Sequence, residues 1–200
     1  MPRTSQVLAA ALLAVACGLP VAAAPSREAR ELAHWVVKSR DHDARAFAVV
    51  DKKHARIFVY DAAGRLQGES PVLIGQAPGD DIAPDVGKHA DQGFVPFKER
   101  TTPAGRFVSQ PGVNRNGEGV VWVDWDSGFA IHRLRPGKSQ RARLARIASD
   151  DLSARRASAG CVVVPVAFYE SVVTRWLARG RAVVYVLPES GSVGNLFNML

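Results

Sequence analysis

SAGCVVVPVAFY, residues 158–169, leads from a loop of small residues through three valines into a helix. Valine is among the residues most often buried, and proline is favoured in the first turn of a helix, where Pro165 stands. Cys161 therefore lies between the small residues Ser158 to Gly160 and an apolar run. Small neighbours would let a substrate approach the thiol, whereas a structural cysteine would be one more core residue beside the valines. Both interpretations stay open on this stretch alone.

The chain after this stretch is predicted to form a helix and then a strand. Residues 165–180 place apolar side chains on one helical face and end at Gly180. Residues 181–188, RAVVYVLP, have the composition of a strand. The segment 188–200 is left as a C-terminal tail without assigned structure. The apolar face of the helix comprises Val166, Phe168, Tyr169, Val172, Val173, Trp176 and Leu177.

The chain before this stretch is predicted to be mostly strands. Apolar or aromatic residues alternate with polar ones, and compositions typical of turns separate the runs. A proline- and glycine-rich excursion at 76–105 is a candidate rim for a site. Residues 138–148 have helical spacing, with Leu144 and Ile147 inward and basic side chains outward, and residues 27–40 read as an amphipathic docking helix. The expected strands are residues 46–51, 55–61, 66–75, 105–110, 120–126 and 129–134.

The N-terminus has the pattern of a secretory leader. Arg3 precedes an apolar run and then small residues, and cleavage after Ala23 is the preferred site. Lipidation of Cys17, which would tether the protein to a membrane, is the alternative. The apolar run is shorter than the ~20 residues that a membrane span needs, so no stable membrane insertion is expected. The expected location is the periplasm, with oligomeric state left open.

The mature chain, of residues 24–200, is expected to form one domain with one cysteine. Its length and the 47% hydrophobic content of the sequence suffice for a single core. With Cys17 removed, Cys161 has no partner for an intramolecular disulfide. The net charge, +7 for the whole sequence and +6 once Arg3 is removed with the leader, favours anionic partners, which outside the cytoplasm means wall polymer or lipid head groups and not nucleic acid. One cysteine and scattered histidines lack the spacing of metal ligands, so no metal is expected.

His132 is the candidate base for a Cys161 nucleophile. A cysteine attacks as thiolate, and cations or an imidazole nearby lower the pKa of the thiol. Each of the five histidines precedes Cys161, an order that disfavours papain-like peptidases. Only His132 ends an apolar strand, which would hold its side chain rigidly. A structural histidine is the alternative.

Three motifs resemble the L,D-transpeptidase catalytic domain: TTPAGRF at 101–107, IHR at 131–133 and the Ser-x-Gly-Cys stretch at 158–169, the last typical of a proteobacterial branch. The resemblance implies a mainly β (α+β) domain, a mixed β-sandwich or barrel-like core with flanking helices. It covers residues 46–187, preceded by a linker and docking helix at 24–45. No cofactor is implied.

The resemblance also implies a set of roles. Cys161 would form a thioester with the carbonyl of the third residue of a peptidoglycan stem peptide, and His132 would move the proton. The backbone N–H groups of Gly160 and Cys161 would hold the oxyanion. Ser158, Arg133 and Arg156 would orient these groups or bind substrate, with the carbonyl near Arg133 orienting the imidazole.

One departure from the family pattern leaves alternatives open. Val163 stands where arginine or asparagine is usual, which would remove a polar group from the site. A catalytically silent wall-binding module is therefore one alternative to a transpeptidase. An L,D-carboxypeptidase is another, and a sortase-like enzyme using Arg175 or Arg181 is a third.

Overall fold

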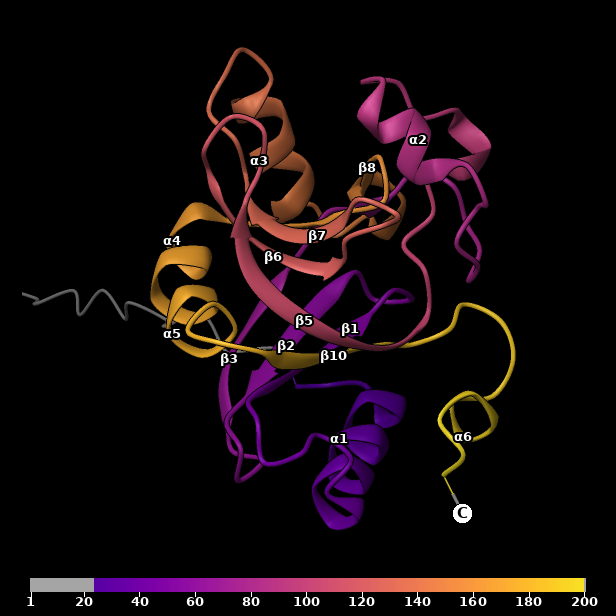
Figure 1. Cartoon of the computed structure of the whole chain (residues 1–200), viewed down its shortest axis with the longest axis vertical. Coiled ribbons are helices and arrows are strands. Elements are labelled where there is room, and N and C mark those ends of the chain that lie inside the picture. The colour runs from indigo at the N-terminus through magenta and orange to yellow at the C-terminus, as the bar shows by residue number, and fades with distance from the viewer. Residues whose placement is uncertain (1–23, 200) are drawn as a thin grey trace, which may run out of the picture.

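The computed structural model describes residues 24–199, and it is built on a mixed sheet with the strand order β3-β2-β1-β10-β5-β6-β7-β9 (Figure 1). Neighbouring strands are antiparallel except for β1 with β10 and β7 with β9. The expected leader and Cys17 lie outside the described residues. The strands are β1 Phe47–Asp51, β2 Arg56–Tyr60, β3 Leu66–Pro71, β4 Ile74–Gly75, β5 Gly105–Val113, β6 Gly119–Asp124, β7 Phe129–Arg133, β8 Arg156–Ser158, β9 Val162–Val164 and β10 Ala182–Val186.

The sheet curls until its two edges meet. Just beyond β3, Leu73 exchanges two backbone hydrogen bonds of 2.9 Å with Val163 of β9, the strand at the opposite edge. A short parallel pair of β4 with β8 lies beside this junction. Pairing the edges satisfies backbone groups that an open sheet would leave exposed. The mainly β, barrel-like fold class predicted from the sequence is confirmed.

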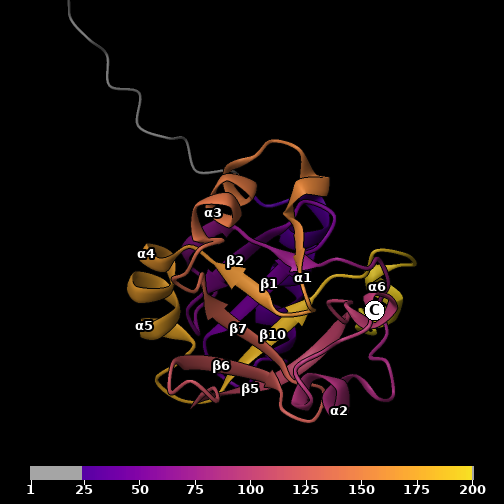
Figure 2. The same cartoon turned by 90° about the horizontal axis from the view of Figure 1, so that it is seen from above.

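The interior of this curled sheet is filled by alternate strand residues and by one helix. Residues 166–176 are continuously helical, through α4 Val166–Phe168, a π-helical turn η3 Tyr169–Val173 and α5 Thr174–Trp176. The extra residue of the π turn shifts the apolar face, so that Tyr169, Val173 and Leu177 are the ones that reach the core. In Figure 2 these helices lie along one side of the sheet.

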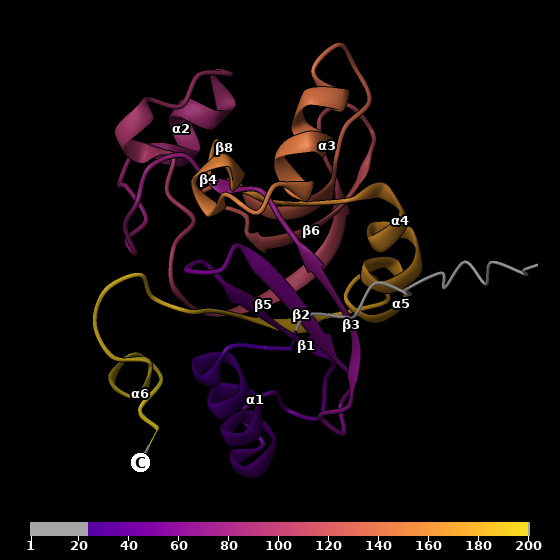
Figure 3. The same ribbon diagram turned by 180° about the vertical axis from the view of Figure 1, so that it is seen from behind.

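A second apolar layer covers the other face of the sheet. Helix α1, Arg27–Ser39, packs Leu32 and Val36 against strands β1, β2 and β10. The C-terminal segment also packs here, because α6, Val193–Leu196, and Phe197 join the same cluster. Figures 1 and 3 place α1 and α6 at one end of the molecule and α2 and α3 at the other.

The long excursion contains more secondary structure than the sequence predicts, and the basic helix is more exposed than predicted. The excursion contains α2, Val86–Asp91, and a 3-10 turn η1, Phe97–Glu99. Helix α3, Gln140–Ala148, buries Ile147, but Leu144 is 49% exposed, so its predicted inward position is wrong. Ile147 is the buried residue of this helix, and Leu144, three positions earlier, points to solvent. A further 3-10 turn, η2 Leu152–Arg155, follows it.

Across residues 24–199, no helix combines the length and the apolar content that a membrane crossing requires.

Candidate active site

Cys161 lies at the turn that enters β9, and Gly160 makes this turn possible. Gly160 has a φ of +127°, a region that side-chain-bearing residues rarely adopt. A Cβ atom at this position would also come within 2.9 Å of the carbonyl oxygen of Thr101. Cys161 is partly exposed as a residue, and its thiol donates to the carbonyl oxygen of Gly128 over 3.5 Å. A glycine before the cysteine is therefore required by backbone geometry and by the close approach of Thr101.

His132 reaches the same region because β7 runs parallel to β9. The strand register pairs His132 with Val163, two residues after Cys161. The imidazole is 8% exposed, and its Nδ1 lies 2.8 Å from the carbonyl oxygen of Arg133. A carbonyl only accepts, so Nδ1 carries the proton and Nε2 is left with its lone pair. His132 and Cys161 line one cleft, although no hydrogen bond joins the imidazole to the thiol in the described part of the chain.

Burial favours the neutral form of both side chains. Burial raises the pKa of the Cys161 thiol, against the lowering by the Ala130 backbone and by the charges of Arg135 and Arg143. Burial also lowers the pKa of His132 to about 4, against the raising effect of the Arg133 carbonyl. Arg135 and Arg143, and not the sequence neighbours Arg155 and Arg156, are the cations that lower the thiol pKa, and burial outweighs them. This arrangement suits a neutral imidazole that takes the thiol proton during attack, and not a resting ion pair.

Ser158 organises the loop before Cys161. Its hydroxyl donates to the carbonyl oxygen of Cys161 over 2.6 Å and accepts from the N–H of Gly160 over 3.1 Å. The Gly160 N–H is thus already engaged, which leaves the Cys161 N–H as the remaining donor of the expected oxyanion pair. The structure places Ser158 as a residue that holds the loop.

Thr102 is a residue of the site that the sequence analysis did not single out. Its buried hydroxyl donates to the carbonyl oxygen of Gly160 over 2.7 Å and accepts from the N–H of Gly75 over 2.8 Å. The TTPAGRF motif therefore supplies the group that fixes the turn before Cys161. The presence of this motif in the same chain as the Ser-x-Gly-Cys stretch was the available signal, but spacing alone does not show that the two segments touch.

A group of four charged side chains, here called the paired cluster, supports Thr102 from behind: Lys52, Asp80, Arg156 and Glu189. The ammonium of Lys52, whose side chain is 1% exposed, donates to the Thr102 carbonyl over 2.9 Å and to Asp80 over 2.6 Å. Burial of Asp80 is outweighed by hydrogen bonds from Lys52 and from two backbone N–H groups, which lower the pKa of this carboxyl to about 2. No sequence pattern indicated this cluster, because its members lie far apart along the chain.

The remaining predicted site residues lie at different depths. Arg156 pairs with Glu189 in the paired cluster and does not line the cleft. The Arg133 side chain pairs with Glu118 over 3.0 Å, and its carbonyl orients the imidazole. Val163 is fully buried, with its backbone closing the barrel and its side chain packed in a small apolar cluster. An apolar residue at 163 is thus explained by packing.

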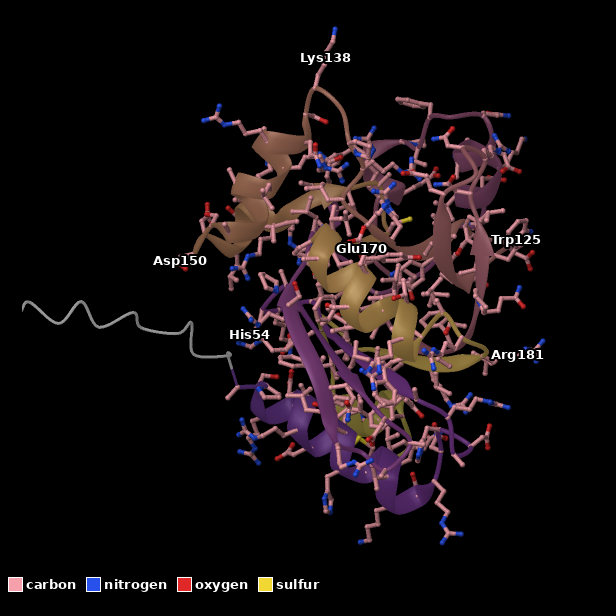
Figure 4. All side chains as sticks on the ribbon, turned by 90° about the vertical axis from the view of Figure 1, so that its left-hand side faces the viewer. His54, Trp125, Lys138, Asp150, Glu170 and Arg181 are labelled. Carbon is pink, nitrogen blue, oxygen red and sulfur yellow. The ribbon has the colours of Figure 1, made fainter. Side chains whose placement is uncertain are left out.

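The sortase-like alternative finds no support in the placement of its arginines. The guanidinium of Arg175 lies over the ring of Trp176, and Arg181 lines a hollow beside Trp125. Figure 4 shows Arg181 and Trp125 at the same edge of the molecule. Neither arginine lines the cleft that His132 and Cys161 share.

The cleft has two parts, which meet at Cys161. On one side the thiol faces a smaller hollow of Thr101, Pro103, Phe129 and the loop around Gly128. On the other side lies the larger cleft with His132 and three arginines, Arg100, Arg135 and Arg143. An extended peptide could therefore pass over the sulfur with contacts on both sides.

Residues 24–199 contain no group of three or more acidic, histidine or cysteine side chains placed to hold a metal ion.

Comparisons with known proteins give distant structural similarities and no match in sequence. No family model matches the chain, and no curated protein does. The catalytic domain of the Enterococcus faecium L,D-transpeptidase is 18% identical over 72% of this chain and 98% of that domain, with a TM-score of 0.39. The helical cell shape determining protein Pgp2 from Campylobacter jejuni is 14% identical over 83% of this chain and 57% of that one, with a TM-score of 0.44.

A third solved structure, a fused Zn-dependent amidase/peptidase/peptidoglycan-binding domain-containing protein from Clostridium acetobutylicum, is 14% identical. The match spans 84% of this chain and 65% of that one, with a TM-score of 0.41. The chain covers less than two thirds of this protein and of Pgp2.

Proposed function

We propose that this protein is a periplasmic L,D-transpeptidase that acts on peptidoglycan stem peptides through a Cys161 thioester. The observation that carries the proposal is that His132 and Cys161 line one cleft, with Nδ1 of the imidazole held by a carbonyl and Nε2 free to accept a proton. The motifs that resemble this family in the sequence are the ones that build the cleft. No cofactor is needed for this chemistry.

The reaction begins when Nε2 of His132 accepts the thiol proton while the sulfur attacks the carbonyl carbon of the third stem residue. The oxyanion that forms is held by the Cys161 N–H, and loss of one such donor costs about 3 kcal/mol in other enzymes. Collapse breaks the peptide bond, and the imidazolium gives its proton to the departing D-alanine amine. An acceptor amine then attacks the thioester to form the new amide bond and restores the thiol.

Hydrolysis of the same thioester would make the protein an L,D-carboxypeptidase, and the geometry of the site allows both outcomes. A silent wall-binding module is the alternative of a different class, since burial raises the pKa of the Cys161 thiol. A reactive Cys161 thiol is expected of a transpeptidase or a carboxypeptidase and is not expected of a silent binding module.

The test is acylation by a carbapenem, measured as the intact mass of purified protein. A reactive Cys161 opens the β-lactam ring, forms a thioester and gains the whole mass of the drug, and peptide mapping should place the adduct on Cys161. The matched control is Cys161→Ala, which should gain nothing. An unmodified wild-type protein after long exposure, in a sample whose fold is verified by circular dichroism, would contradict the proposal.

A positive result leads to a second measurement that divides the catalytic outcomes. The protein is incubated with a stem tetrapeptide, with and without an acceptor stem, and the products are weighed. A cross-linked dimer supports transpeptidation, whereas a tripeptide alone supports the carboxypeptidase.

A further inference from the structure

Arg143 on helix α3 has a charged group without a partner inside the cleft. Its Nε atom is buried and has no hydrogen-bond acceptor among residues 24–199. No ion pair involves its guanidinium either, and the side chain lines the cleft together with His132 and Cys161. Buried polar groups nearly always have a partner, so this exception calls for an explanation.

The other two arginines of the cleft differ from Arg143, because the side chain of each has an acceptor among the described residues. Arg100 donates to the carbonyl oxygen of Val95 over 2.8 Å and to the side-chain oxygen of Gln76 over 2.5 Å. Arg135 lies 3.3 Å from a carboxylate oxygen of Glu118. The carboxylate that serves Arg135 also serves Arg133, over 3.0 Å. Arg143 is thus the cleft arginine whose donors remain unused in the described structure.

The surroundings of Arg143 favour an anion. Burial and the neighbouring positive charge of Arg135 lower the pKa of Arg143, and Cys161, in its thiolate form, raises it. Partial burial and the nearby charge of a second cation raise the free energy of an unpaired guanidinium. A bound carboxylate lowers this free energy, because its negative charge opposes both effects. A guanidinium presents parallel N–H donors that match the two oxygens of a carboxylate.

We propose that Arg143 binds a carboxylate of the donor stem peptide and thereby determines which stems the enzyme accepts, an inference that rests on the proposed function. A stem tetrapeptide offers two carboxylates close to the bond that breaks. One is the terminal carboxylate of the departing D-alanine, and the other is on the side chain of the diamino acid whose carbonyl is attacked. Arg143 is a specificity residue in this proposal and takes no part in proton transfer.

Helix α3 is the element that makes this contact possible. It follows the loop after β7, whose tip carries Lys138 away from the rest of the molecule in Figure 4. Its other basic side chains, Arg141 and Arg146, are exposed, whereas Arg143 is partly buried and Ile147, one turn further on, is buried. The burial of Ile147 against Leu134 and Val163 anchors the helix, and Arg143 lines the cleft one turn before it.

The experiment measures binding to the inactive Cys161→Ala protein, so that it does not depend on turnover. Three tetrapeptides are compared by calorimetry: one with both carboxylates free, one amidated at the diamino acid side chain and one amidated at the terminal D-alanine. Amidation of the carboxylate that Arg143 binds should weaken binding roughly 10- to 100-fold, the range of a lost charged hydrogen bond. Amidation of the other carboxylate should change binding little, which identifies the source of the anion.

Variants of Arg143 complete the test in the same background. Arg143→Gln should bind the free peptide as weakly as the sensitive amidated one, and it should no longer distinguish the two. Arg143→Lys should recover part of the affinity, because it keeps the charge without the paired donors. Arg141→Gln, which removes a charge from an exposed position of the same helix, is the control and should behave like the parent.

Two failures can be told apart. Equal affinity of the parent protein for all three peptides, or discrimination that survives in Arg143→Gln, would overturn the role of Arg143 even if Cys161 is acylated by a carbapenem. Absence of acylation in the wild-type protein would instead overturn the proposed function. The comparison of amidated peptides needs no Arg143 variant, so it stands even if Arg143→Gln fails to fold.

Discussion

Two groups of polar side chains flank the Gly160–Cys161 turn, and they differ in how completely their charges are matched. In the paired cluster, Lys52 and Asp80 meet through a hydrogen bond of 2.6 Å, and Arg156 meets Glu189. On the cleft side, Arg143 has no acceptor among the described residues, and His132 keeps Nε2 free. The paired cluster reaches this turn through Thr102, which accepts from Lys52 and donates to Gly160.

This difference indicates that the paired cluster stabilises the fold, whereas the cleft side chains serve binding and chemistry. A fully hydrogen-bonded buried network fixes the backbone around it, because any movement breaks several bonds at once. An unmatched group at a cleft costs stability in the free protein, and a ligand that completes it regains that cost. Changes in the paired cluster should therefore affect unfolding, and changes in the cleft should affect chemistry and binding.

Replacement of His132 by Asn should have the largest effect, on catalysis. The amide cannot accept the thiol proton as imidazole does, so the rate of Cys161 acylation should fall roughly 10²- to 10⁴-fold. Stopped-flow measurement with a chromogenic β-lactam gives this rate. A rate within a factor of three of the wild-type value would contradict the role of His132 as base.

The same variant sharpens the comparison through its pH dependence. The pKa of His132 is about 4 in the folded protein and near its ordinary 6.5 when unfolded. As the pH falls from 6.5 to 4, the unfolded state takes up a proton that the folded state refuses, so the wild-type protein should lose up to about 3 kcal/mol of stability. Urea unfolding at pH 7 and pH 4.5 should show a smaller loss for His132→Asn.

Replacement of Lys52 by Met should affect stability more than chemistry. It removes the cation from Asp80 and the donor from the Thr102 carbonyl. A fully buried broken pair costs more, but Asp80 is 21% exposed and water screens it, so a loss of about 2 kcal/mol is expected. Arg143→Gln is the matched change in the cleft and should alter the free energy of unfolding by less than about 0.5 kcal/mol. Equal losses in both variants would remove the distinction drawn here.

Replacement of Thr102 by Val should have the smallest effect of the three. Valine keeps the shape but loses the hydroxyl that joins Gly75 to Gly160, for a loss of about 1 to 2 kcal/mol. Thr102→Ser keeps the hydroxyl and should lose less than Thr102→Val in urea unfolding. An acylation rate reduced in the Val variant and retained in the Ser variant would show that the turn also needs this bond for chemistry.

Several features of this protein were readable from local sequence. Alternation of apolar residues predicted the strands, and helical periodicity with Pro165 predicted the helix after β9. The candidate roles of Cys161 and His132 were recognisable from neighbouring residues alone. Gly160 directly precedes the cysteine, and the apolar residues before His132 mark the end of a strand. The secretory leader remains a prediction from the same kind of local pattern.

Contacts between distant segments were decided by the tertiary structure alone. The parallel pairing of β7 with β9 places His132 and Cys161 on one cleft, and the packing of Val163 with Leu73 and Ile147 explains why Val163 is apolar. Whether an arginine is paired, as Arg156 is, or unpaired, as Arg143 is, depends on which acidic groups the fold brings near it. Sequence determines periodicity and backbone preference, because these act between neighbours. The electrostatic matching of side chains far apart along the chain exists only once the barrel has closed.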